Sequence, residues 1–217
     1  MAISVTNVAQ GFSSSSPSVT SSYTTTSGRL YVVNIFASAT SNSYSVSGSN
    51  GNVTTWTQIS GGYLNPGSGS SSTWYGYATS SGSTTLSITN TTGNNVWWVI
   101  DEISNVASSA GVVQQATVAS TNTSPASITL SSFASSSNGV YATFWSPNSQ
   151  TWTTKSGWTT VFNSAIGGAA NHILTEYKAS NDTNPTGGFS SVQVNGWAAE
   201  IAVPPSVNNV VLCTCGF

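Results

Sequence analysis

Short apolar blocks separated by clusters of Ser, Gly and Asn are the feature that most constrains the fold of this 217-residue chain. The blocks are rich in Val, Ile, Thr, Tyr and Trp, which favour the pleated, half-buried surface of a sheet. Strong helix formers such as Glu, Lys, Leu and Met are scarce. The expected strands are 30–36, 84–89, 96–103, 126–130, 140–145, 173–177 and 191–203. The pattern predicts an all-β fold, an antiparallel and jelly-roll-like β-sandwich.

Similar blocks recur in the same order in the two halves of the chain, which indicates an internal two-fold sequence repeat. The matched blocks are 30–36 with 140–145, 56–59 with 158–161, 74–77 with 175–178, and 98–103 with 197–201. We expect a β-sandwich over 1–206, with repeat halves of about 1–106 and 107–206, and a C-terminal tail over 207–217. Two tandem small β-sandwiches are the alternative. The expected core anchors are Trp56, Trp158, Trp98 and Trp197.

The very low charge limits the classes of function. Only eight residues are Lys, Arg, Asp or Glu, whereas an ordinary domain carries roughly a quarter. A net charge of −2 with three scattered basic residues argues against nucleic acid and against anionic membrane surfaces, which need clustered Lys and Arg. No stretch reaches the ~18 apolar residues of a transmembrane helix. A surface so poor in charge opposes self-association only weakly, which favours a protein that packs against its own copies.

Candidate catalytic groups are few. Asp101 and Glu102 are neighbours, so on a strand they point to opposite faces. Glu102 and Glu200 hold matched positions, and we interpret each as accepting hydrogen bonds from loop amides, with a glycosidase-like carboxylate pair as the alternative. The only histidine, His172, has no nearby Cys or Asp that would complete a metal site. We therefore expect no catalytic residue, cofactor or metal, and a protein that is not an enzyme.

The tail over 207–217 is uncharged and follows Pro204-Pro205, which ends the preceding strand. Its candidate interface residues are Val210, Val211, Leu212, Cys213, Cys215 and Phe217. We expect the tail to add a strand to a neighbouring molecule, with a fold-back onto its own sandwich as the alternative. The two cysteines are interpreted as free thiols, and intermolecular cross-linking is the other possibility.

The aromatic segment 74–77 is a candidate sugar-stacking platform. Because strand side chains alternate, Trp74 and Gly76 share one face and Tyr75 and Tyr77 share the other. At least one of these faces is expected to be core.

Three motifs carry a resemblance to a known family. They are 51–57 (Gly-Asn-Val-Thr-Thr-Trp-Thr), 74–78 (Trp-Tyr-Gly-Tyr-Ala) and 101–106 (Asp-Glu-Ile-Ser-Asn-Val). Over roughly residues 28–203 the chain resembles a β-sandwich module of phage and bacterial surface and virion proteins. It departs from that pattern by two extra residues before Trp56 and by Asn105 in place of the usual Gly. The resemblance implies a surface or virion module and names no ligand.

These observations favour a non-enzymatic virion structural protein: a capsid decoration protein, head fibre or tail component. Its expected partners are its own copies and a capsid or tail protein, and its expected location is the virion. A carbohydrate-binding surface module is one alternative, with glycans as partners. A subunit of an extracellular filament or surface layer is another, located outside the cell or at its surface.

Overall fold

The computed structural model describes residues 1–37, 43–59, 69–91, 95–108, 111–121, 123–167, 171–189 and 193–205. Every regular element within these ranges is a strand. The predicted all-β, antiparallel sandwich is confirmed. The first half contains β1 (Ser4–Ser13), β2 (Ser18–Val19), β3 (Tyr23–Thr25), β4 (Leu30–Ala37), β5 (Tyr44–Gly48), β6 (Val53–Gln58), β7 (Ser70–Ala78), β8 (Gly82–Thr84), β9 (Leu86–Asn90) and β10 (Val96–Ser104). The second half contains β11 (Val112–Thr121), β12 (Ala126–Ser127), β13 (Gly139–Ser146), β14 (Thr159–Ala165), β15 (His172–Lys178), β16 (Thr186–Gly187) and β17 (Val194–Ile201).

Each half builds one large antiparallel sheet of five strands. The order is β1-β10-β4-β7-β6 in the first half and β11-β17-β13-β15-β14 in the second. If the five strands of each large sheet are numbered by their order along the chain, both sheets have the strand order 1-5-2-4-3. The sequence repeat itself stays a prediction, but the two large sheets have one topology.

Smaller sheets cover the outer face of each large sheet. In the first half these are β2-β9-β5 and β3-β8, and in the second half β12-β16 with an isolated bridge between Thr153 and Gly188. In the first half the chain crosses repeatedly between the layers. The strands β1, β4, β6, β7 and β10 lie in the large sheet, and β2, β3, β5, β8 and β9 lie in the small sheets. This repeated crossing between layers is the jelly-roll feature of the fold.

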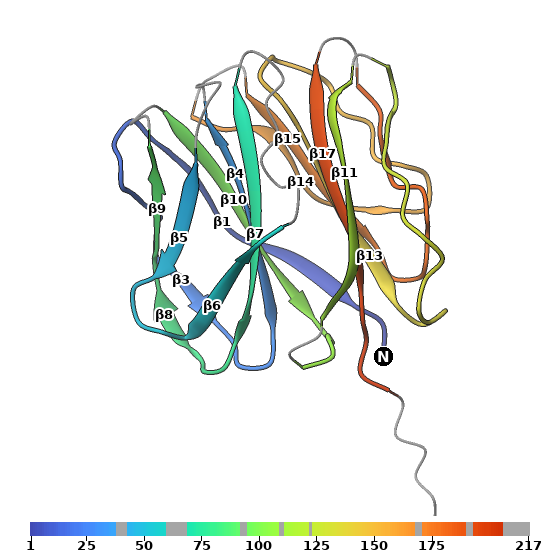
Figure 1. Cartoon of the computed structure of the whole chain (residues 1–217), viewed down its shortest axis with the longest axis horizontal. Helices are drawn as coiled ribbons and strands as arrows, with labels where there is room; N and C mark the ends of the chain where they lie inside the picture. The colour runs from blue at the N-terminus through green and yellow to red at the C-terminus, as the bar shows by residue number, and fades with distance from the viewer. Residues whose placement is uncertain are drawn as a thin grey trace, which may run out of the picture.

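The two large sheets pack against each other, so the molecule has four layers (Figure 1). One core lies between the first large sheet and its small sheets, and it contains Tyr31 and Trp98. A second core lies between the large sheets and contains Val32 of β4 and Tyr141 of β13. A third lies within the second half, around Phe144. Because both faces of the large sheets are covered, every residue of β4, β13 and β17 is buried.

The edge strands of the large sheets are β1, β6, β11 and β14, and none contains a charged residue or a proline. All charged residues that lie in strands belong to the interior strands β10, β15 and β17. The ladder of each edge strand has a register shift, whereas the ladders between interior strands are regular. A bulge bends and twists an edge and so hinders open-ended pairing. Here bulges provide the edge protection that charges provide in other sheets.

The four tryptophans expected as core anchors lie in different environments. Trp98 is buried in the core of the first half, and Trp197 is buried between the two large sheets. Trp158 is buried in the core of the second half, whereas Trp56 is only partly buried against the first. Trp98 and Trp197 therefore point to opposite sides of corresponding strands and serve different cores.

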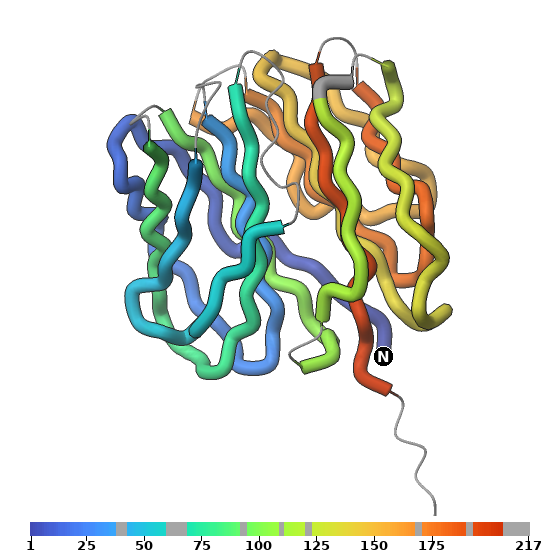
Figure 2. Tube along the Cα trace, in the orientation of Figure 1, coloured from blue at the N-terminus to red at the C-terminus, as the bar shows by residue number. Residues whose placement is uncertain are grey.

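The N-terminus and the last described residues lie at the same end of the molecule (Figure 2). At this end Ala107 and Gly111, which flank the link between the halves, exchange backbone hydrogen bonds with Ala202 at 2.9 and 2.8 Å. Asn105 has a φ of 57°, a left-handed conformation that Asn tolerates better than most residues. Asn105 stands where the resembled pattern has Gly, and the backbone there suits either residue.

Replacing Trp145 should disrupt the contact between the large sheets. Its side chain is 1% exposed and stacks on Phe36 of the other sheet, with ring centroids 5.2 Å apart and an interplanar angle of 24°. We expect Trp145→Ala to lower the free energy of unfolding by about 3–5 kcal/mol, measured by urea denaturation. The control is Phe12→Ala, since Phe12 is 39% exposed and should lose far less. Equal losses in the two variants would contradict this account of the packing.

Candidate functional site

Glu200 joins the edge strand β11 and the loop that precedes β13 in the second half. Its carboxylate accepts hydrogen bonds from the Gln114 side chain (2.7 Å), the Ala134 backbone amide (2.9 Å) and the Asn138 side chain (2.6 Å). The residue is fully buried. A carboxylate that accepts three hydrogen bonds from the protein has a structural role, which agrees with the interpretation of Glu200 from the sequence.

Glu102 serves the first half differently, since it accepts a hydrogen bond from the hydroxyl of Tyr31. The residues next to the two glutamates, Ile103 and Ile201, both point into the core between the large sheets. Because side chains alternate along a strand, Glu102 and Glu200 point outward, away from each other. The alternative of a catalytic pair formed by these two carboxylates is therefore wrong.

Asp101 lies at the centre of a buried polar network between the large sheets. Its carboxylate accepts hydrogen bonds from Asn7 (2.9 Å) and from the Tyr141 hydroxyl of the other sheet (2.7 Å). Asn34 donates to the Tyr141 oxygen (2.8 Å) and accepts from Thr73 (3.1 Å). Burial raises the pKa of Asp101 to about 6, against the opposing effect of the bonds from Asn7 and Tyr141. The network joins the halves through polar groups that have partners.

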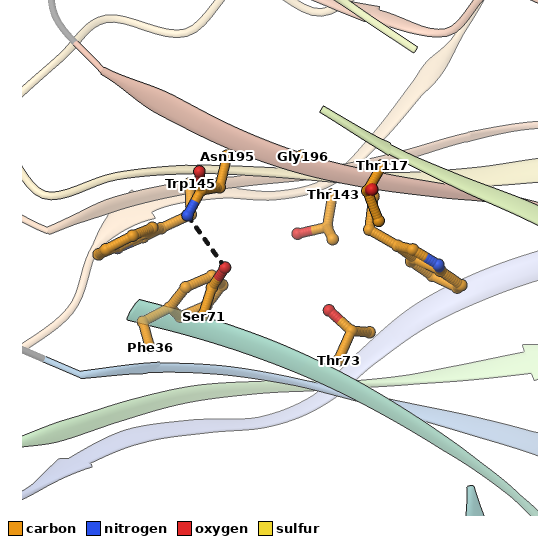
Figure 3. Close-up of a pocket in the computed structure, with 9 residues that line it drawn as sticks. Phe36, Ser71, Thr73, Thr117, Thr143, Trp145, Asn195 and Gly196 are labelled. Atoms are coloured by element: carbon orange, nitrogen blue, oxygen red, sulfur yellow. Dashed lines mark hydrogen bonds between the residues drawn. The ribbon is translucent and has the colours of Figure 1, made fainter. Parts of the chain in front are cut away.

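Close to this network the large sheets leave a small polar gap (Figure 3). Ser71 of the first sheet accepts a hydrogen bond from Asn195 of the second, at 3.2 Å. Phe36 and Trp145 close one side. The gap has room for only about 10 Å³, which suits one water molecule rather than a ligand. It is therefore part of the packing and not a binding site.

Four of the eight charged residues gather at one corner of the second half. Asp182 forms ion pairs with Lys155 (2.9 Å) and Lys178 (3.3 Å) and accepts a hydrogen bond from Trp158 (3.0 Å). Burial acts to raise the pKa of Asp182, but the bonds from Lys155, Trp158 and Lys178 hold it well below its usual range. Glu176, next to this cluster, accepts a bond from the Lys155 backbone amide (3.2 Å). Its burial raises its pKa to about 8. The contacts of Asp182 hold Trp158 and the 179–185 loop in place.

His172 lies four residues from Glu176 on β15, which places the two about 13 Å apart along the strand. Burial lowers the pKa of His172. In the ranges given above, no three His, Cys, Asp or Glu side chains meet in a way that could hold a metal ion. Within the same ranges, no helix is long and apolar enough to cross a membrane.

The side chains of the aromatic segment 74–77 on β7 point to two opposite faces of the sheet, as the alternation predicts. Trp74 turns to the core of the first half and donates a hydrogen bond to Ser72 (2.9 Å). Tyr75 and Tyr77 lie on the other face, where they are partly buried at the margin of the core between the large sheets. There they line an open groove of about 310 Å³. Period-two alternation identified the shared face of the two tyrosines, but the groove depends on the packing of the second sheet.

The candidate interface residues Val210, Val211, Leu212, Cys213, Cys215 and Phe217 lie outside the described residues. No family model matches the chain, and the comparisons with curated proteins and with solved structures give no match.

The two raised carboxyl pKa values make stability depend on pH in a defined direction. A carboxyl whose pKa is higher in the folded than in the unfolded state stabilises the fold below about pH 4, and this contribution is lost as the pH rises through the folded value. In the wild type, ionisation of Glu176 should lower the free energy of unfolding as the pH rises from about 4 to about 8. We expect Glu176→Gln to abolish this decrease. Asp101→Asn should likewise abolish the decrease in unfolding free energy between about pH 4 and about pH 6.

Urea denaturation from pH 4 to pH 9 measures both effects as the difference between each variant and the wild type. The difference is the relevant quantity because the lowered pKa of His172 acts in the opposite direction below about pH 6.5. Variants that follow the wild-type pH profile in parallel would show that folding does not raise the pKa of these carboxyls.

Proposed function

We propose that this chain is a non-enzymatic structural protein of a virion surface, acting by self-association and by attachment to a capsid or tail protein. The observation that carries the proposal is the placement of charge: the four edges of the large sheets are uncharged, and the charged strand residues are interior. Uncharged edges are surfaces on which another chain can pair.

The use of the acidic residues supports a non-enzymatic role. All five carboxylates have structural partners or are buried inside the sheets: Asp101, Glu102, Glu176, Asp182 and Glu200. General acid–base chemistry needs such groups to converge on a space that a substrate can enter. In the described part of the chain the carboxylates instead form hydrogen bonds and ion pairs that stabilise the fold.

The four-layer arrangement supports a building-block role. Each large sheet is covered on both faces, so the halves form one block whose outer surface is rich in Ser and Thr hydroxyls. A subunit of an extracellular filament or surface layer would use the same uncharged edges, and it is the second candidate. The resemblance of the motifs to virion modules favours the first.

Introducing charge on two edges should weaken self-association. We expect the wild type to exceed the monomer mass of 22.2 kDa in light scattering, and the double variant Val113→Lys, Ser164→Lys to move toward that mass. Val113 is 43% exposed on β11, and Ser164 is exposed on β14. The matched control is Ser132→Lys, a charge on an exposed loop position. A wild type that stays monomeric at all concentrations would refute self-association.

Deleting 206–217 tests the contribution of the tail separately. We expect the truncated chain to assemble less, in line with strand addition to a neighbour. Unchanged assembly would leave the edges of the large sheets as the contact surface and remove the tail from the proposal.

A further inference from the structure

The groove beside β7 has the features of a binding site that the structural role does not use. Its walls come from β6 and β7 of the first half and from Gly111, which precedes β11. Its volume of about 310 Å³ is at the lower end of the range for small-molecule sites. It is lined by Leu30, Thr54, Thr55, Thr57, Tyr75, Gly76, Tyr77, Thr79 and Gly111.

A bulge in β6 shapes this groove. Val53 pairs with Ala78 and Trp56 with Gly76, so Thr54 and Thr55 together oppose the single residue Tyr77. A bulge of this kind re-aims side chains, and both threonines line the groove. The bulge coincides with the extra residues that separate this chain from the resembled pattern before Trp56.

The close approach of β6 to β7 keeps the groove in shape. A β-carbon at Gly76 would lie 2.8 Å from the Thr55 carbonyl oxygen and would also collide with Val53. Only glycine therefore lets the bulged strand lie this close between the two tyrosines.

The lining combines two aromatic rings with free hydroxyl groups and no charge. Tyr75 and Tyr77 are two residues apart on one face, so their backbone positions are about 7 Å apart along the strand. Among the described residues, the side-chain oxygens of Tyr75, Tyr77, Thr54, Thr55 and Thr57 have no hydrogen-bond partner. Thr79 donates to the Asn52 carbonyl (3.3 Å). Each free hydroxyl can donate one hydrogen bond and accept others.

We propose that this groove is a binding site for a neutral carbohydrate, with Tyr75 and Tyr77 contacting the apolar face of the sugar rings and the threonines of β6 hydrogen-bonding their hydroxyls. The absence of charge from the lining selects against acidic and basic ligands, because a charged group would be desolvated there without a partner. A ligand with hydroxyl groups at its rim and C–H groups on its faces matches both parts of the lining.

The second half provides an internal comparison. Tyr75 pairs with Val32 on β4, and Tyr177 pairs with Tyr141 on the corresponding strand β13. Tyr177 also lies at the margin of the core between the large sheets, but the residue two positions further on, Ala179, has no ring. Two tyrosines spaced two residues apart on this face are therefore found on β7 and not on the corresponding strand β15, and Tyr177 is a natural control.

The test is isothermal titration calorimetry of the full chain with the neutral oligosaccharides maltohexaose, cellohexaose and hexa-N-acetylchitohexaose. We expect at least one to bind with a dissociation constant below about 1 mM. Tyr77→Ala should weaken that binding about tenfold or more, and Tyr177→Ala should leave it unchanged. Since a folding defect in Tyr77→Ala would also weaken binding, Thr55→Lys serves as a second variant that fills and charges the groove from an exposed position.

Three results of the titration would overturn the proposal. They are no binding of any neutral oligosaccharide, binding that survives both Tyr77→Ala and Thr55→Lys, and equal loss in Tyr177→Ala. A change in tyrosine fluorescence on deletion of 206–217, with no response to any sugar, would identify the groove as a seat for the chain's own tail and would also overturn it. None of these results depends on whether copies of the chain assemble, so the site and the structural role fail independently.

Discussion

The packing of one large sheet on the other is the interaction on which the rest of the structure depends. Most β-sandwiches bury one face of each sheet, but here both faces of both large sheets are covered. The contact combines aromatic stacking of Phe36 on Trp145 with the polar bond from Tyr141 to Asp101. A purely apolar contact would tolerate sliding of one sheet over the other. A buried hydrogen-bonded pair fixes the register of the two halves, since any slip would leave a carboxyl without its donor.

The same packing explains where charge can lie in this chain. Interior strands are rigid and rich in possible donors, so a buried carboxyl there is satisfied by several neighbours, as Glu200 is by side-chain and backbone groups. Edge strands offer fewer partners, and in this protein they carry hydroxyls and bulges. The bulges of β1, β6, β11 and β14 twist the edges without making them repulsive. Such edges can still pair with a specific partner strand, while their bulges hinder the addition of further strands into a continuous sheet.

The sequence predicted the parts of the fold that follow from local pattern. The runs 30–36 and 140–145 are almost continuously apolar because β4 and β13 are buried on both faces, and they were recognised as strands. The four edge strands β1, β6, β11 and β14 are absent from the expected strand ranges, since a bulge interrupts the ladder of each. Parts of β6 and β14 are present only as the matched blocks 56–59 and 158–161. The shared face of Tyr75 and Tyr77 was predictable from the period of two, but the wall provided by Gly111 depends on how the halves pack. The bond from Tyr141 to Asp101 joins different halves and leaves no local signal.

The interior placement of charge also determines how the molecule responds to its medium. Dissolved salt weakens contacts between exposed charges by screening them. Contacts made by the uncharged edges have nothing to screen, and the ion pairs of Asp182 are partly sheltered from solvent. Strongly hydrated anions such as sulfate strengthen the burial of apolar surface. An assembly formed through these edges would therefore keep its cohesion from dilute buffer to concentrated brine, a tolerance that a surface of paired Lys and Glu could not provide.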